Sequence, residues 1–386
     1  MRAIMLKEFQ ELRRDRRTLA LLIVMPLLLL IIFGYAANFT VDNLTVAVYG
    51  ASADDVTKLI DDNAQLKDHL TVLVTDTSGT KDDATTELQN DKADVAIYAV
   101  PGSGALSADV YIDGSNLFAA QAAKTIFAEV QQQLAVQAAK AQASAPPGTV
   151  IPVPQITVSV LFNPDLKTSW VMIPAIIGLI LTFIGTIITS IGLVREREAG
   201  TLEQLAVMPL RAGSVVLGKI TPYFLLACFD MALITTLGLL LFGVPFNGSP
   251  WIFAVGAGLF LFVVLGLGVL ISSVSRTTGQ AIQLAFLILL PQILLSGMIF
   301  PLSAMAAGVR WIGYLLPLTW FTMVSQGVMI RGAGWDSLWF PVVILAIMAI
   351  VIFGLAVVRL SRSISPVRQR KVAEKAPEQS PEKVTA

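Results

Sequence analysis

The sequence predicts an α-helical membrane protein with six transmembrane helices and an α/β extracytoplasmic domain inserted between the first and second of them. Hydrophobic residues make up 55% and charged residues 14% of the 386 residues, whereas soluble domains carry roughly 25% charged residues. Six apolar runs are long enough to cross about 30 Å of hydrocarbon. One long segment without such a run, residues 38–168, separates the first run from the other five.

The N-terminal segment combines basic residues with the first apolar run. Residues 1–18 contain six Lys and Arg, and their apolar residues share one side of a helix. We therefore expect an amphipathic connecting helix along the inner leaflet; a simple cluster of stop-transfer charges is the alternative. The apolar run 19–37 is longer than the about 7 to 15 residues of a signal peptide, which predicts a retained transmembrane helix 1.

Residues 38–168 have the composition of a soluble domain. They contain 16 Asp and Glu, 7 Lys and no Arg, a net charge of 7 − 16 = −9. Apolar residues that alternate predict strands, and apolar residues at helical spacing predict helices, so a small α/β fold is expected. The expected strands are Leu44–Tyr49, Leu70–Thr75, Asp94–Val100 and Ala108–Ile112, with an extended segment at Gln155–Phe162, and the expected helices are Ala53–Asn63, Asp82–Asn90 and Asn116–Ala143.

Residues 169–360 hold the other five apolar runs and are the expected transmembrane domain. Lys and Arg gather before the first run, between the second and third runs and after the last run, while the connection 243–250 has none. Because positive residues are retained in the cytoplasm, both termini are expected there and residues 38–168 outside. The basic tail 361–386 is expected to be disordered. The five runs are Trp170–Val194, Val216–Phe242, Trp251–Val274, Ala281–Phe300 and Phe340–Val358.

The stretch after the fifth apolar run is too interrupted for a clean span. Gly297, Pro301, Gly308 and Pro317 break it. A re-entrant segment near 301–321, which dips into the outer leaflet and returns, would let the last span run inward.

The connection between the second and third runs, residues 195–211, is charged and helix-forming. Thr201 followed by Gln204 fits a capping box, and the apolar residues around them recur at helical spacing. Pro209 then ends the helix. An isolated helix of this kind would be read as an interfacial anchor, but between two spans it is placed to act as a cytoplasmic lever.

Residues suited to enzyme chemistry are scarce. Gly213–Lys219 matches the skeleton of a phosphate-binding loop, but Ile220 occupies the Ser/Thr position that binds magnesium. The single cysteine, Cys228, and the single histidine, His69, can form neither a disulfide nor a Cys/His metal cluster. We expect no catalytic residue, cofactor or metal on this chain, and no nucleic-acid partner.

Several polar residues lie inside the apolar runs. The acidic one among them, Asp230, is at mid-span depth, where an unpaired charge costs at least about 2.5 kcal/mol; it is either functional or bonded to a neighbouring helix. Three threonines at helical spacing in the second run form a stripe that suits a helix contact or a substrate lining. The pathway candidates are Thr182, Thr186, Thr189, Asp230, Gln283 and Gln292.

Four markers in order along the chain carry a resemblance to a known family. They are KEFQELRRDRRTLALLIVMPLLLLIIFGYA at 7–36, FNPDLKTSWVMIPAIIG at 162–178, REREAGTLEQLAVMPLR at 195–211, and LLSGMIFPL at 294–302 followed by LLPLTWF at 315–321. Together they resemble the permease subunits of ABC-2 family ABC exporters, in the bacterial multidrug-type branch with a large outer domain. The resemblance covers nearly the whole chain.

The resemblance implies a transport subunit of the bacterial inner membrane that exports hydrophobic or amphiphilic molecules, such as drugs or lipids. ATP and magnesium would then belong to a separate ATP-binding subunit, and a second permease chain would complete the pathway within the membrane lipid. A periplasmic adaptor is a further possible partner of the outer domain. By the same analogy the residues that couple to the ATPase are Arg195, Glu196, Arg197, Glu198, Gly200, Thr201, Glu203 and Gln204.

Two other classes of function compete with this one. A secondary transporter driven by an ion gradient would use Asp230 as its ion site, although we detect no inverted repeat. A membrane-anchored sensor would use residues 38–168 to bind a ligand, but that leaves the charged connection 195–211 without a role.

Overall fold

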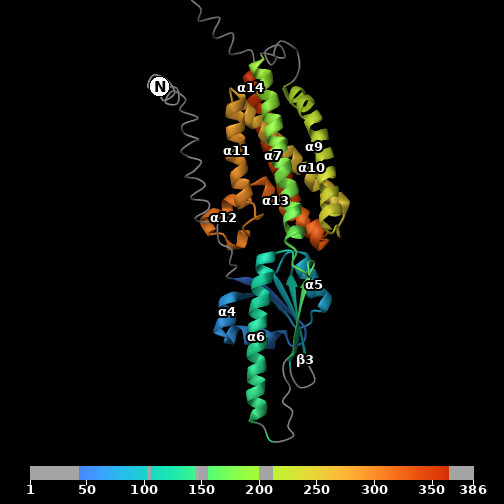
Figure 1. Ribbon diagram of the computed structural model, residues 1–386, viewed down its shortest axis with the longest axis vertical. Helices are drawn as coiled ribbons and strands as arrows, with labels where there is room; N and C mark the ends of the chain where they lie inside the picture. Colours follow the sequence, from blue (N-terminus) through green and yellow to red (C-terminus); the bar gives the residue numbers. More distant parts are fainter. Residues whose placement is uncertain (1–42, 102–105, 145, 147–154, 200–211, 365–386) are drawn as a thin grey trace, which may run out of the picture.

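The computed structural model describes residues 43–101, 106–144, 146, 155–199 and 212–364. Within them, an α/β unit occupies one end of the long axis and a bundle of long helices the other (Figure 1). The predicted connecting helix 1–18 and transmembrane helix 1 at 19–37 lie outside the described residues, as does the tail from residue 365 onward.

The α/β unit is built on a five-stranded sheet in the order β2-β1-β3-β4-β5. Strand β4 runs antiparallel to β3, and the other neighbouring pairs are parallel. All four predicted strands and the extended segment are confirmed to within two residues at each end. The strands are β1 (Leu44–Tyr49), β2 (Leu70–Asp76), β3 (Val95–Pro101), β4 (Leu106–Asp113) and β5 (Gln155–Leu161).

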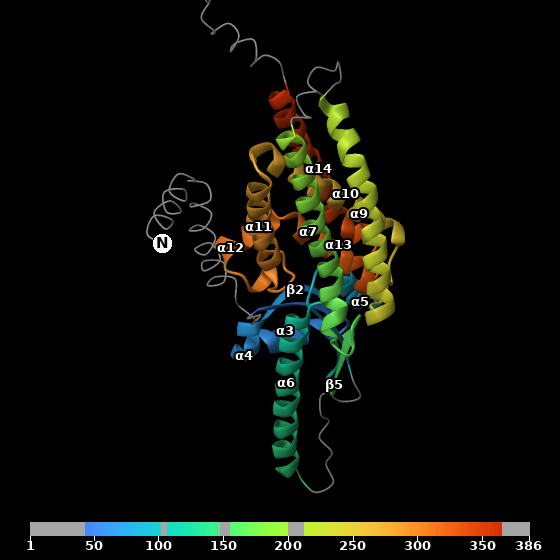
Figure 2. The same cartoon turned by 45° about the horizontal axis from the view of Figure 1, so that its top comes forward.

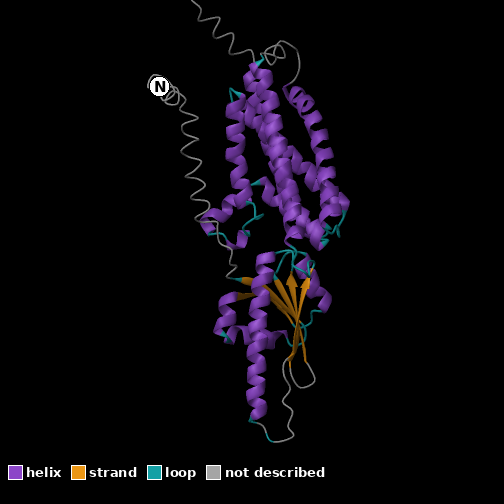
Figure 3. Ribbon diagram, viewed as in Figure 1, coloured by secondary structure: helices purple, strands orange, loops and turns teal. Residues whose placement is uncertain are grey.

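Helices cover both faces of this sheet, as the orange strands between purple helices show in Figure 3. Helices α3 (Ala53–Asp62) and α6 (Leu117–Ala143) bury apolar residues against one face, and α5 (Lys81–Gln89) does so against the other. Thr80 caps α5 in a capping box with Asp83. The polar helix α4 (Ala64–His69) follows α3 and has no counterpart among the predicted helices.

Five helices in the described residues are long and apolar enough to cross a membrane. Helix α10 packs against both α7 and α14 and is the most buried of the five. Helices α9 and α14 are the least buried and expose many large apolar side chains, as lipid-facing helices do. Figure 2 shows these helices side by side. They are α7 (Thr168–Glu198), α9 (Ala212–Phe242), α10 (Pro250–Val274), α11 (Thr278–Leu295) and α14 (Trp335–Ile364).

The boundaries of two predicted segments are wrong. Helix α11 ends at Leu295 rather than near Phe300, because Ser296 caps it and Gly297 has a positive φ of 86°. The predicted re-entrant segment passes through Phe321 instead of ending there. It comprises a 3₁₀ turn (Leu302–Ala304), α12 (Ala307–Tyr314), α13 (Pro317–Gln326) and a π-helical turn (Gly327–Arg331).

The start of the charged connection also differs from the prediction. The predicted span ends at Val194, but α7 continues through Arg195–Glu198, which form its last turn. The apolar face of α7 runs into these charged residues without a break, so the helix does not end where the hydrophobic run does. The capping box at Thr201 and Gln204 lies outside the described residues.

Candidate functional site

A narrow, mostly apolar crevice with a few polar side chains lies inside the bundle, between α7 and α11. Thr182 and Thr186 of α7 line it together with Gln292 of α11, and all three side chains are buried. The hydroxyl of Thr182 donates to the carbonyl oxygen of Gly178 over 2.7 Å. Among the described residues, the Thr186 hydroxyl and both polar atoms of the Gln292 amide have no hydrogen-bond partner. Buried amides are normally paired, so leaving this one without a partner costs stability.

The rest of the predicted pathway does not gather at this crevice. Thr189 is fully buried and lines a second small crevice, with Tyr223 and the half-buried Asp230 of α9. Gln283 is exposed on α11. The stripe of threonines therefore forms the packing surface of α7, with Gly268 of α10 directly against Thr189. The structure therefore places the candidates in two groups on two sides of α7. Thr182, Thr186 and Gln292 form one group, and Thr189 and Asp230 form the other.

The coupling candidates lie at the end of α7 farthest from the α/β unit. Arg195 is exposed there, and the Glu198 carboxylate accepts two hydrogen bonds from Thr278, from its backbone N–H and from its hydroxyl, each over 3.1 Å. Glu198 thereby satisfies donors in the first turn of α11, where a negative charge also suits the helix dipole. Glu196 and Arg197 belong to the same turn of α7. Gly200, Thr201, Glu203 and Gln204 lie outside the described residues.

An ion-pair cluster joins the other end of the bundle to the α/β unit. Arg331, at the end of the π-helical turn, is 6% exposed, and its Nη1 lies 2.9 Å from Asp91 Oδ1 and 3.8 Å from Asp113 Oδ2. The same nitrogen donates to the Ser115 hydroxyl over 3.2 Å. A buried guanidinium with two carboxylates is held strongly, because removal of either partner strands a charge.

Burial governs the protonation of Asp113. It raises the pKa of this carboxyl from 3.8 to about 6, and the nearby Arg331 charge opposes that rise. Asp91 raises the pKa further, whereas hydrogen bonds from Ser115 lower it. The cluster therefore changes its net charge in mildly acidic solution.

Further hydrogen bonds fix the α/β unit to the bundle near Arg331. Gln89 donates to the carbonyl oxygen of Gly332 over 3.0 Å, and Ser337 donates to that of Asn90 over 3.1 Å. A second attachment is the turn from β5 into α7, where the buried Asn163 side chain bonds to Gly114 and Lys167. The α/β unit is thus anchored at two separate points.

Sequence reasoning missed Arg331 and Thr278. The partners of Arg331 lie more than 200 residues away in the chain. Arg331 is a basic residue at the end of an apolar segment and is followed by Gly332. This pattern is a weak sequence signal for a functional or structural charge at that position. Among the described residues, no group of three metal-ligating side chains comes together.

In the part of the chain that the structure describes, five apolar helices and an attached α/β unit define a multi-pass membrane protein. Residues 16–358 match the family described as ABC-2 family transporter protein. The chain belongs to this family, in which the membrane subunit is the transport component.

Several relatives share this family. The probable multidrug ABC transporter permease YbhR of Escherichia coli K12 is 29% identical over 360 residues, which cover 88% of this chain and 93% of YbhR. The similarly named YbhS of the same strain is 29% identical over 372 residues, 94% of this chain and 97% of YbhS. ABC transporter G family member 20 of Dictyostelium discoideum is 28% identical over 258 residues, 66% of this chain and 34% of that protein.

Proposed function

We propose that this chain is the membrane-spanning permease subunit of an ATP-driven exporter, which moves hydrophobic or amphiphilic molecules out of the cytoplasm or inner leaflet. The match of residues 16–358 to the ABC-2 family is the observation that carries this proposal. The names of YbhR and YbhS, probable multidrug permeases, support drug-like molecules as the substrate class; lipids are the other class that we propose.

In this proposal the chain works in the bacterial inner membrane with other subunits. Residues 19–37 complete six spans, both termini lie in the cytoplasm, and residues 38–168 lie outside. ATP and magnesium bind to a separate ATP-binding subunit that docks on residues 195–211. A second permease chain completes the pathway, and the outer domain is free to meet a periplasmic adaptor.

The contact between Glu198 and Thr278 supports a route for the coupling. A pull on the loop after Glu198 would be transmitted to the first turn of α11 through two hydrogen bonds. Helix α11 carries Gln292 about three to four turns further on, against Thr182 and Thr186 of α7. A shift of α11 along α7 would open this crevice and expose its unpaired polar groups to substrate or water.

Purification of the tagged full-length protein from its native membrane tests the proposal. Wild-type protein should bring down an ATP-hydrolysing subunit in mild detergent, and Glu203→Arg should lose it because the docking surface reverses its charge. Glu129→Arg, the same change on the exposed face of α6, should retain the ATPase. A well-folded wild type that recovers no ATPase would contradict the exporter.

Replacement of Asp230 by Asn separates the exporter from a gradient-driven carrier. The ATP-driven exporter should retain ATP-dependent transport in Asp230→Asn, whereas a carrier that uses this carboxylate should lose all coupling to a proton gradient. Transport by reconstituted vesicles, with ATP or with an imposed proton gradient, distinguishes the two.

A further inference from the structure

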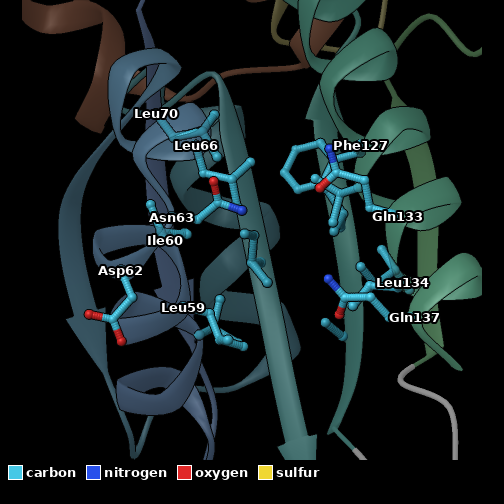
Figure 4. A pocket seen from close by; sticks show the side chains of 16 residues that line it. Leu59, Ile60, Asp62, Asn63, Leu66, Leu70, Phe127, Gln133, Leu134 and Gln137 are labelled. Carbon is cyan, nitrogen blue, oxygen red and sulfur yellow. The ribbon is translucent and has the colours of Figure 1, made fainter. Parts of the chain in front are cut away.

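A deep apolar groove opens on the face of the α/β unit that carries α3, α4 and α6. Its volume is about 530 Å³. Figure 4 shows Leu59 and Leu66 on one side, pointing across the gap toward Phe127 and Leu134 of α6, with the sheet as the floor. The side chain of Leu59 is 57% exposed. Apolar side chains left open to solvent around a cavity of this size are typical of binding sites for small molecules.

The polar side chains of the groove lie toward its rim. Asn63, Gln133 and Gln137 supply amide groups beside the apolar lining. Asp62 is the charged residue among those that line the groove, and a smaller adjoining hollow contains Glu129. Among the described residues, neither cavity has a Lys or Arg in its lining, and the smaller hollow also contains His69. Figure 4 shows the Asp62 carboxylate pointing away from the gap, so Asp62 and Glu129 make the surroundings of the groove negative rather than bind a ligand directly. An anionic head group would be repelled there, so the chemistry favours a neutral or cationic ligand.

The size of the groove suits a small molecule. Pockets for drug-sized ligands measure about 300 to 1,000 Å³, a range that contains the volume of this groove. A drug-sized amphiphile with an apolar body fits the cavity, with its polar end among the amides at the rim.

We propose that this groove, between Leu59 and Leu66 on one side and Phe127 and Leu134 on the other, binds a neutral or cationic amphiphilic small molecule outside the helical bundle. The site is separate from the crevice between α7 and α11. Binding requires neither ATP nor an ATPase, so its failure and the failure of the exporter proposal are distinguishable.

Cysteine protection tests the site in the full-length chain. Cys228 is replaced by Ser, and Leu134→Cys or Val136→Cys is added; Val136 is 48% exposed on the same helix but does not line the groove. In phospholipid nanodiscs, the cationic dye rhodamine 6G at about ten times its dissociation constant should slow maleimide labelling of Leu134→Cys about tenfold. Labelling of Val136→Cys should not change.

A charge change tests the predicted preference. Gln137→Lys at the rim should raise the rhodamine 6G concentration for half protection by about fivefold, because two like charges come close. Gln132→Lys, on the outer side of the same helix, should leave it unchanged.

Three results would overturn the proposal. One is unchanged labelling of Leu134→Cys at the solubility limit of the dye. Another is equal protection of both cysteines. The third is a Leu134→Cys that does not react without dye, because another chain or lipid would then already cover the groove.

Discussion

Arg331 places a guanidinium where water scarcely reaches, between a helix end of the bundle and two carboxylates of the α/β unit. Its Nε has no hydrogen-bond partner among the described residues, so the ion pair with Asp91 and the contact with Asp113 provide most of its stabilisation. A charge in such a place is tolerated only because the carboxylates are there.

Replacement of Arg331 by Met should therefore destabilise the protein by about 3 kcal/mol, because Asp113 remains buried without its cation. Thermal unfolding in detergent measures the loss. Arg359→Met removes an exposed arginine from α14 and should leave the midpoint unchanged. Addition of Asp113→Asn to Arg331→Met should recover part of the stability. No recovery would mean that the Arg331 charge does not stabilise the buried Asp113 carboxylate.

The raised pKa of Asp113 predicts that acid stabilises this junction. The folded protein holds the proton with a pKa of about 6, compared with 3.8 for an ordinary Asp. The stabilisation is complete below the unfolded pKa and is lost as the pH rises through the folded one. From about pH 6.5 to pH 4, Asp113 should contribute on the order of 3 kcal/mol to stability.

Comparison with Asp113→Asn isolates this contribution, because other carboxylates also titrate. The wild-type protein should gain stability relative to Asp113→Asn as the pH falls through this range. Asp61→Asn, at an exposed position, should follow the wild type. Parallel pH profiles for wild type and Asp113→Asn would show that burial does not perturb Asp113.

At the level of elements, α13 packs closely against α7 at Gly178. A Cβ atom there would overlap the Phe321 ring and lie 2.7 Å from a Leu318 methyl. Gly256 of α10 meets Val324 in the same way. Small residues of this kind let helices approach closely in membranes.

Gly178→Val should separate α13 from α7 and destabilise the bundle by about 1–3 kcal/mol. Gly258→Val is the matched control, since a Cβ at Gly258 of α10 would have nothing within 4 Å. The difference in thermal midpoint between the two variants is the measurement. Equal midpoints would show that α13 is not held at this contact.

The elements that could be predicted from the sequence are those fixed by their own residues. Strand β1 is a short run of mostly apolar residues, and β2 alternates between inward and outward positions. Asn116 accepts from the backbone N–H of Ala119 to cap α6 where the prediction begins that helix. The early end of α11 has a local signal, Gly297 with its positive φ, which the predicted span passes over. Local pattern could not find the course of α13, because its position depends on packing against distant helices. Arg331 and Thr278 escaped detection for the same reason.

For the whole molecule, the proposed orientation in the membrane is the prediction on which the proposed function depends most. In a Cys228→Ser background, Val136→Cys in the α/β unit should react in intact cells with a maleimide that cannot cross the membrane. Arg276→Cys, exposed at the opposite end of the bundle, should react only after the cells are opened. The reverse pattern would invert the proposed topology.

The two attachments of the α/β unit couple the position of the long helix α6 to the arrangement of the bundle. The unit is held both by α7, through the turn at Asn163, and by the segment after α13, through Arg331. A rotation of one attachment against the other must therefore tilt the sheet and α6 with it. Helix α6 has 27 residues and is about 40 Å long, so a tilt of about 10° would carry its far end about 7 Å. A small movement between helices of the bundle would therefore produce a larger displacement at the far end of α6. Spin labels near Ala143 could measure that displacement.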